Sequence, residues 1–395
     1  MEFINDGIVK EKDLLIVKLP SGNSKIIKIE DKKHIELGKF GSFDKDKLIG
    51  KPYGQWYEIF GNGEIRPILN SKFEVLDETG ANNQEIFDGK DSQKISQSEI
   101  EDLKKESKAG TILPQDIIKT IAENNASFEK KTEYSKAKYI KRKESKFLKL
   151  FMPMESTAHN ICEHFFNKTP EKINYIRIDT LSQLLSISNV CSSSRVLAVD
   201  NTQGMIIGSL LSRMERGAIL GIHDGNNHNY DIIRYFNFSE EKKALLHALS
   251  WEQTERQLGE FEEVLPENAT ENETKGRDRR LKSHTLLKNT LDVFRNEPFD
   301  SLVISCDYEP LSVLKKLIVY LGGSRTVSLL AAFEYMRMSQ NFLSVTISES
   351  WLREYQVLPN RTHPLMNMTS SGGYLLSAIY VFTSSEELAK RSKNN

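Results

Sequence analysis

Cysteine is scarce in this chain of 395 residues, which contains only three, at positions 162, 191 and 306. They lie far apart and show no paired spacing of the kind that binds zinc or forms a disulfide framework. His159 and His164 lie close to Cys162, but no second cluster supplies the remaining ligands of a four-coordinate site. We therefore expect no metal site, and a protein of a reducing, intracellular compartment.

Long apolar runs are also lacking. No stretch approaches the ~20 apolar residues that span a bilayer, and the start, MEFINDGIVK, has neither the basic head nor the apolar run of a signal peptide. Neither sign of charge prevails, with 54 Lys and Arg against 55 Asp and Glu. Together with the length, this predicts a soluble, nuclear or cytoplasmic protein of two or more domains with no membrane partner.

Short strand patterns fill the N-terminal part of the chain, residues 1–76. Turn sequences such as Pro20–Asn23 and Gly61–Gly63 separate them, as in β-hairpins. Several short strands at this spacing predict a small β-barrel, which we interpret as a packing or docking module rather than a ligand-binding domain. The expected strands are 13–19, 25–29, 34–43, 55–60 and 65–69.

Residues 77–110 are rich in charged and amide side chains, which predicts a flexible linker. A helical, basic connector follows over 111–190. Within it, Phe128–Lys149 is the most basic stretch of the chain and carries aromatic residues between its cations. This composition suits a nucleic-acid backbone, although a charge run more often forms a solvated face. The candidate contacts are Lys136, Lys138, Tyr139, Lys141, Arg142, Lys143 and Lys146.

From residue 191 strands and helices alternate, which predicts an α/β, Rossmann-like domain over 191–389. Parallel strands followed by a late pair of strands are typical of the S-adenosylmethionine-dependent methyltransferase fold. The span 262–280, acidic and then basic, lacks apolar periodicity and predicts a disordered insertion. The expected strands are 196–199, 218–222, 230–236, 301–305, 326–331, 342–347 and 374–382.

Glycine is missing where such a fold needs it. Residues 194–214 form a strand, a turn and a helix at the position where a nucleotide-like cofactor binds. Against the methyltransferase pattern, Ala198 replaces an acid, Asp200 and Thr202 replace two glycines, and only Gly204 remains. Side chains at these positions fill space that the cofactor needs. The cofactor loop is therefore degenerate, and we expect this chain to bind no cofactor.

Two acids stand at the ends of later strands. Asp224 is placed where an acid grips the cofactor's ribose, and Asp307 where polar residues of nucleic-acid methyltransferases face the target base. Without a cofactor we interpret Asp307 as structural or vestigial, and we assign no catalytic residue. The connection between the last strands carries Arg361 and His363. It is either a plain hairpin loop or a loop that reaches a partner protein or RNA, with Arg361 at a phosphate.

Several long stretches resemble one known family across almost the whole chain. They include ELGKFGSFDKDKLIGKPYGQWYEI, YSKAKYIKRKESKF, ISCDYEP and SESWLREYQVLPNRTHPLMNMTSSGGYLLSAIYV. These stretches are similar to the non-catalytic subunits of the eukaryotic tRNA (adenine-58-N1)-methyltransferase, the Gcd-ten or Trm-six family. Only the linker at 77–110 and the insertion at 262–280 fall outside the resemblance.

The resemblance implies a division of labour between two subunits. A catalytic methyltransferase partner of the same ancestry holds S-adenosylmethionine, two such pairs form a heterotetramer, and the complex methylates N1 of adenine 58 of tRNA in the nucleus. This chain then binds and positions the tRNA. The residues leave two other functions open: an active S-adenosylmethionine-dependent RNA methyltransferase with a working though degenerate loop, and a protein-interaction scaffold without RNA contact.

Overall fold

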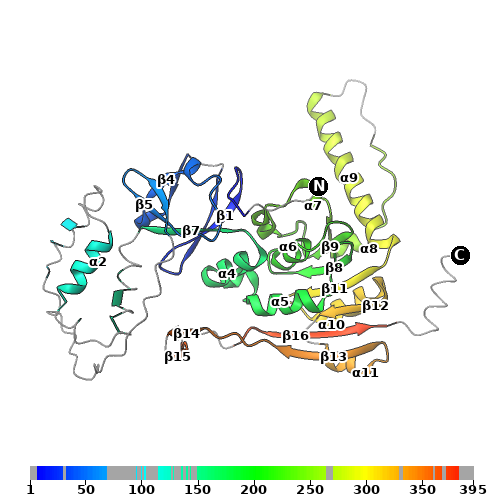
Figure 1. Cartoon of the computed structure of the whole chain (residues 1–395). Coiled ribbons are helices and arrows are strands. Elements are labelled where there is room, and N and C mark those ends of the chain that lie inside the picture. Colours follow the sequence, from blue (N-terminus) through cyan, green and yellow to red (C-terminus); the bar gives the residue numbers. More distant parts are fainter. Residues whose placement is uncertain are drawn as a thin grey trace. The chain divides into compact units, whose positions relative to one another are not determined.

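The computed structural model describes residues 7–29, 33–68, 95, 99, 102–103, 114–125, 128, 135–136, 139–140, 143, 149–263, 270–328, 332–358, 361–366 and 371–381. Two compact units make up the chain (Figure 1): residues 1–160 with 354–366, and residues 161–353 with 367–395. Within the described part, no helix has both the length and the apolar character needed to cross a membrane.

An antiparallel sheet of five strands forms the first unit, in the order β2-β1-β7-β5-β6. The predicted barrel is not confirmed, because the described strands form an open sheet with β2 and β6 at its edges. Strands β3 and β4 pair separately with each other. The strands are β1 (Leu14–Lys18), β2 (Ser24–Lys28), β3 (His34–Glu36), β4 (Ser42–Asp44), β5 (Tyr57–Phe60), β6 (Glu64–Pro67) and β7 (Leu150–Glu155).

The central strand β7 comes from the region expected to be a helical connector. Phe151 of β7 is fully buried and stacks on Phe43 and Tyr57, with ring centroids 4.6 and 5.7 Å away. The lysine-rich sequence before Leu150 masks the period of two, so the pattern does not predict this strand. Further elements of the unit are η1 (Gly38–Phe40), η2 (Lys45–Lys47), α2 (Pro114–Glu123), β14 (Tyr355–Leu358) and β15 (Arg361–Pro364).

A sheet of seven strands forms the second unit, in the order β10-β9-β8-β11-β12-β16-β13. Neighbours from β10 to β12 are parallel, whereas β16 runs antiparallel to both β12 and β13. The predicted Rossmann-like fold with a late antiparallel strand is confirmed. The strands are β8 (Arg195–Asp200), β9 (Ala218–His223), β10 (Leu246–Ser250), β11 (Phe299–Ser305), β12 (Leu321–Ser328), β13 (Phe342–Glu349) and β16 (Tyr374–Tyr380).

The chain reverses its direction of sheet assembly at β8. It adds β9 and β10 on one side of β8, then returns to add β11 on the other side. Ligands of open α/β sheets bind beyond the carboxyl ends of the strands at such a switch point. The turn after β8, residues 200–204, therefore lies at the ligand position of this fold, as the sequence predicts.

The helical elements from residue 158 onward alternate with these strands. Most of them are short, and α9 is much the longest of those described. They are α4 (Ala158–Lys168), η5 (Pro170–Ile173), α5 (Ile178–Ile187), α6 (Met205–Leu211), η6 (Asp231–Phe236), α7 (Glu240–Lys243), α8 (Trp251–Glu255), α9 (Glu271–Asn296), α10 (Pro310–Leu317), η7 (Ile318–Tyr320) and α11 (Phe333–Met338).

One predicted strand is wrong. Residues 231–236 form the 3₁₀-helix η6, which follows directly on Tyr230, with Ile232, Ile233 and Phe236 buried. A short apolar run does not by its period distinguish a buried strand from a buried helical turn. The strand that pairs with β9 on the side away from β8 is instead β10, which the sequence pattern does not predict. The strand expected at 326–331 is present as far as Ser328, and 329–331 lie outside the described residues.

The disordered insertion expected at 262–280 is corrected over its last ten residues, because α9 begins at Glu271, while residues 264–269 lie outside the described part of the chain. Thr270 caps this helix: its hydroxyl accepts the N–H of Glu273, and the Glu273 carboxylate accepts the N–H of Thr270 (2.8 Å). Such a cap stabilises a helix start without an apolar stripe. The helix therefore forms where hydrophobic periodicity gives no sign of it.

Candidate functional site

Asp200, the last residue of β8, turns its carboxylate back onto the start of α6. Its Oδ1 accepts hydrogen bonds from the N–H (2.6 Å) and hydroxyl (2.5 Å) of Thr202, and its Oδ2 accepts one from the N–H of Ile207 (3.0 Å). The Thr202 hydroxyl oxygen accepts the N–H of Ile206 (3.2 Å). Both acceptor side chains are buried. The first backbone donors of α6, which have no partner within a helix, are thus satisfied by the chain itself.

The environment of Asp200 combines burial with donated hydrogen bonds. Burial raises the pKa of its carboxyl group, and the hydrogen bonds from Thr202 and Ile207 oppose that shift without cancelling it. All of these partners belong to the turn and to α6. The Asp200 side chain therefore points back onto the turn and stabilises it by hydrogen bonds. The sequence pattern suggests instead a side chain that extends into the space of the ligand.

Tyr230 closes the outer side of the same turn. The Cα and Cβ of Tyr230 and the Cγ1 of Ile233 each lie 3.0 Å from the point where a Cβ on Gly204 would stand. The Tyr230 hydroxyl would collide with a Cβ on Gly221, in β9. Gly204 also has a φ of 84°, a left-handed conformation that favours glycine. The surviving glycine is therefore required by the packing of η6 and by the backbone, and not only by a ligand.

These residues do not fit S-adenosylmethionine. Nucleotide-like ligands of this fold approach the backbone of the first turn and the start of the following helix. Here Tyr230 and Ile233 cover Gly204, and Asp200 and Thr202 take up the helix donors. We derive no methyl-transfer step from this turn.

Asp224 stands directly after β9, at the strand end where the sequence places it. It is exposed, and its Oδ1 accepts the N–H of Gly225 (2.9 Å). A cluster of three rings lies next to it in the chain: His228 stacks on Tyr230 with centroids 4.7 Å apart, and His223 meets both rings edge-on. Burial lowers the pKa of His228, so this ring favours its neutral form.

Asp307 stands after β11, at the same edge of the sheet as the turn. Its two carboxylate oxygens accept one amide each, from Asn174 Nδ2 (2.8 Å) and Asn201 Nδ2 (3.2 Å). The N–H of Asn201 also donates to the carbonyl oxygen of Ser305 (2.8 Å), which links the ends of β8 and β11. This arrangement agrees with a structural role for Asp307, because its carboxylate joins three segments of the unit.

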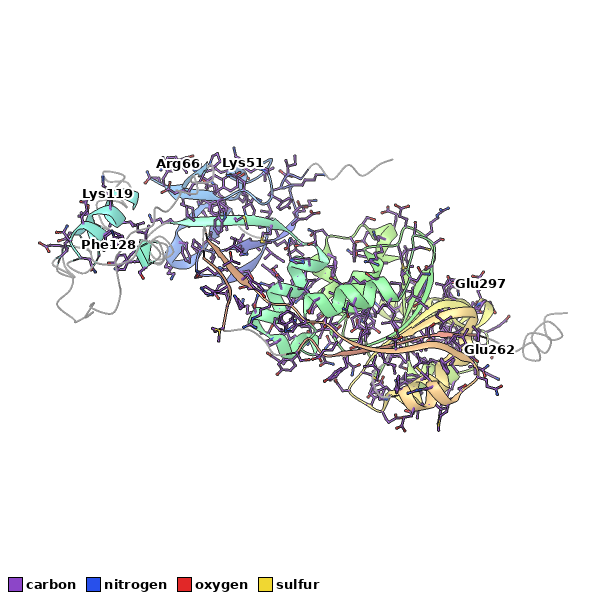
Figure 2. The ribbon with its side chains drawn as sticks, turned by 60° about the horizontal axis from the view of Figure 1, so that its bottom comes forward. Lys51, Arg66, Lys119, Phe128, Glu262 and Glu297 are labelled. Atoms are coloured by element: carbon purple, nitrogen blue, oxygen red, sulfur yellow. The ribbon has the colours of Figure 1, made fainter. Side chains whose placement is uncertain are left out.

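The basic stretch is described at three of its candidate residues, Lys136, Tyr139 and Lys143. The rings of Phe128 (labelled in Figure 2) and Tyr139 lie 5.5 Å apart. The Lys136 Nζ lies 5.8 Å from the centre of the Phe128 ring, and the Lys143 Nζ 5.0 Å from that of Tyr139. Both distances are within the range of a cation–π contact. The other candidates lie outside the described residues: Lys138, Lys141, Arg142 and Lys146.

Arg361 and His363 lie on β15, which pairs with β14 in a hairpin. Two residues apart on one strand, they share a face of that hairpin. His363 is exposed, whereas the Arg361 side chain lies outside the described residues. The hairpin belongs to the first unit, as do Lys136 and Lys143. The structure therefore assigns both sets of candidate nucleic-acid contacts to one unit.

The two ends of the connection that carries this hairpin are tied to the start of α5. Thr180 Oγ1 donates to the carbonyl of Gly372 (2.5 Å) and lies 3.0 Å from Ser350 Oγ. Arg177 donates to the carbonyl of Ser350 (3.2 Å) and is itself held by two bonds of 2.7 Å to Asp179. These groups fix the places where the connection leaves β13 and rejoins β16.

One family of known proteins matches most of the chain. A family model described as the Gcd10p family matches residues 8–285. The chain belongs to the Gcd10p family. A curated relative from Schizosaccharomyces pombe, tRNA (adenine(58)-N(1))-methyltransferase non-catalytic subunit trm6, is 30% identical over 96% of this chain and 94% of its own. Its namesake from Debaryomyces hansenii is 28% identical over 95% of this chain and 87% of its own.

A solved structure supports the fold of this Gcd10p-family chain. The S-adenosylmethionine-dependent O-methyltransferase TM0748 of Thermotoga maritima matches with a TM-score of 0.50 over 96% of both chains, at 10% identity. At this identity the likeness shows the fold alone.

The sequence of this Gcd10p-family chain predicts the degenerate turn but not the contacts that surround it. Tyr230 lies in a segment expected to be a strand, so its position over Gly204 and Gly221 has no sequence signal. Nothing in the sequence distinguishes Asn174 and Asn201 from other asparagines, although both donate to Asp307 in the folded chain. Each of these contacts joins residues from different elements, and no single stretch of sequence predicts it.

Proposed function

We propose that this chain is a non-catalytic, tRNA-binding subunit of a tRNA (adenine-58-N1)-methyltransferase. One observation carries the proposal: the turn after β8 is closed by Asp200 and Tyr230 at the place where the fold binds its cofactor. The names of the curated relatives, non-catalytic subunits of that enzyme, support it. The degenerate loop then marks a chain that keeps the methyltransferase fold and leaves the chemistry to a partner.

The partner in this proposal is a catalytic chain with an intact first loop. It holds S-adenosylmethionine, whereas the present chain binds no cofactor. Two pairs of chains form a heterotetramer, and the complex acts in the nucleus.

The contribution of this chain is to hold the tRNA. N1 of adenine lies on the base-pairing edge, so it must be exposed from the folded RNA before it is methylated. A folded RNA is gripped mainly through its shape and its phosphates. The cations of the basic stretch, with Arg361 and His363 of the hairpin, are suited to this task. Aromatic rings lie within cation–π range of the described cations Lys136 and Lys143.

The test separates cofactor binding from methyl transfer. Titration calorimetry of the isolated chain with S-adenosylmethionine should give no heat of binding, whereas the complex with its co-purifying methyltransferase chain should bind it. The complex should methylate a tRNA transcript, and the isolated chain should not. Stoichiometric cofactor binding by the isolated chain, together with methyl transfer, would establish the active-enzyme alternative.

A variant sharpens the same test. Asp200→Gly restores one glycine of the loop, but Ala198, Thr202 and the overlying Tyr230 remain. We expect no gain of cofactor binding from this variant. The RNA role is tested separately, by crosslinking the complex to tRNA. If this chain gives no crosslink to tRNA, with none through residues 136–149 or around Arg361, the scaffold function would be favoured instead.

A further inference from the structure

Helix α9 is an arm of the second unit rather than a packed element of it. Over its 26 residues only Thr290, Leu291 and Phe294 are buried, all in the last two turns. Figure 1 shows the preceding turns extending away from the sheet. One turn before these buried residues, Leu286 is already 66% exposed. The first two thirds of α9 therefore present side chains to solvent.

One face of α9 is held by the segment that runs back along it, residues 256–263. Arg280 forms an ion pair with Glu263, the His284 ring lies 5.5 Å from that of Phe261, and Arg295 donates to the carbonyl of Arg256 (2.8 Å). Contacts in this order show that the segment and the helix are antiparallel. With the capped start at Thr270, they make the arm a defined structure.

A different face of the arm carries cations. Lys275, Arg279 and Lys282 recur at spacings of four and three residues, and Leu286 continues the series, so these four side chains lie on one side of the helix. Lys275 forms an ion pair with Glu271, one turn earlier on the helix (2.5 Å). Arg279 and Lys282 are exposed, and no ion pair joins either to another residue of the described chain. We call Lys275, Arg279 and Lys282 the cationic stripe.

The charge of one stretch of α9 departs from that of the chain. Lys and Arg nearly equal Asp and Glu in the chain as a whole, 54 against 55. Between residues 275 and 288, in contrast, six cations face a single carboxylate: Lys275, Arg277, Arg279, Arg280, Lys282 and Lys288 against Asp278. The carboxylates of the arm flank this stretch, at Glu271 and Glu273 and in the antiparallel segment at Glu260, Glu262 and Glu263. The part of the arm that attracts an extended polyanion is therefore the stretch 275–288.

We propose that the cationic stripe of α9 binds phosphates of RNA, as a second contact to the tRNA. This inference rests on the proposed function and adds to it a site in the other unit. The stripe spans about 10 Å of helix axis, and a nucleic-acid duplex presents a phosphate charge about every 1.7 Å along its axis. Arg279 also supplies the planar donors that suit a phosphate group.

The experiment measures binding of a fluorescent tRNA transcript by the full chain in complex with its co-purifying methyltransferase chain. The test variant is Arg279→Gln/Lys282→Gln. The control variant, Arg216→Gln/Lys288→Gln, loses the same two residue types at exposed positions of the same unit. Lys288 lies on α9 but on a different face from the stripe. Because the two variants lose the same charge, a difference between their affinities reports a contact at the stripe and not the total charge of the chain.

Affinity is compared between about 50 and about 200 mM salt, over which each phosphate contact contributes roughly threefold. For two contacts, the affinity ratio of native complex to test variant should grow about tenfold as the salt is lowered. The control variant should follow the native complex. Equal behaviour of the test and control variants would overturn the stripe as a site.

A result confined to the stripe leaves the proposed function intact. If the test variant binds like the native complex while variants of the basic stretch lose affinity, the α9 contact is refuted and tRNA binding stands. If the native complex shows no affinity for the transcript, both proposals fail. If the test variant instead loses its methyltransferase partner and keeps its tRNA affinity, the stripe is a protein-binding surface and the RNA contact is refuted.

Discussion

Replacement of Asp200 by alanine tests whether this side chain stabilises the turn that it occupies. The variant deprives the buried N–H groups of Thr202 and Ile207 of their acceptor. Each buried donor without a partner costs about 1–3 kcal/mol. Loss of the carboxyl group also removes its own burial cost, which offsets part of that sum. We expect the second unit to lose about 2–4 kcal/mol of unfolding free energy.

The assay is urea unfolding of the full chain, combined with amide hydrogen exchange at α6, because two compact units need not unfold together. Faster exchange at Ile206 and Ile207 would locate the loss. Asp224→Ala is the matched control: the same substitution at the exposed end of the neighbouring strand, where we expect about 0.5 kcal/mol or less. If both variants lose the same small stability, Asp200 does not hold the turn, and our account of the closed site is refuted.

Three further predictions follow from other parts of the structure. Replacing Lys141, Arg142 and Lys143 by alanine should weaken tRNA binding and reduce its salt dependence by about one slope unit for each phosphate that is no longer bound, as measured by titration at several salt concentrations. Burial lowers the pKa of His164 to about 4. Because this ring is neutral in the folded chain and gains a proton on unfolding, up to about 3 kcal/mol of stability should be lost as the pH falls from about 6.5 towards 4. His164→Gln should lack that slope in urea unfolding, and an unchanged slope would contradict the assignment. The buried Tyr230 hydroxyl has no hydrogen-bond partner among the described residues, so Tyr230→Phe should unfold at equal or higher urea concentration, with a gain of about 1 kcal/mol at most; a clear loss would mean that the hydroxyl has a partner.

The sheet of the second unit follows from the sequence to the extent that its strands are buried on both faces. Val196–Val199 and Ala218–Ile222 read as strands because continuous apolar runs of this length fit a covered parallel sheet. The errors occur where tertiary contacts overrule the local pattern. The run Ile232–Phe236 is apolar enough for a strand but packs as a helical turn, and β10, with a mixed pattern, takes the place in the sheet.

The first unit shows the opposite problem, because one of its central strands comes from a distant part of the sequence. β7 follows a long segment after β6 and pairs with both β1 and β5. No local signal connects Phe151 with Phe43 and Tyr57, although their stacked rings form part of the core. A barrel inferred from the first 76 residues alone lacks this strand. The open sheet is the arrangement that includes it.

The degenerate turn could be predicted from residue identity, but its mechanism could not. The replacement of glycines predicts only that side chains occupy space that a ligand would need. The structure adds that Gln203 (φ 53°) and Gly204 (φ 84°) both adopt left-handed backbone in this turn. The donors at the start of α6 are satisfied in this conformation by Asp200 and Thr202. A side chain that only obstructed the site would leave these buried donors without partners, at a cost of about 1–3 kcal/mol each. Asp200 and Thr202 therefore supply the acceptors that these donors need, which explains how the turn remains stable although two glycines of the methyltransferase pattern are replaced.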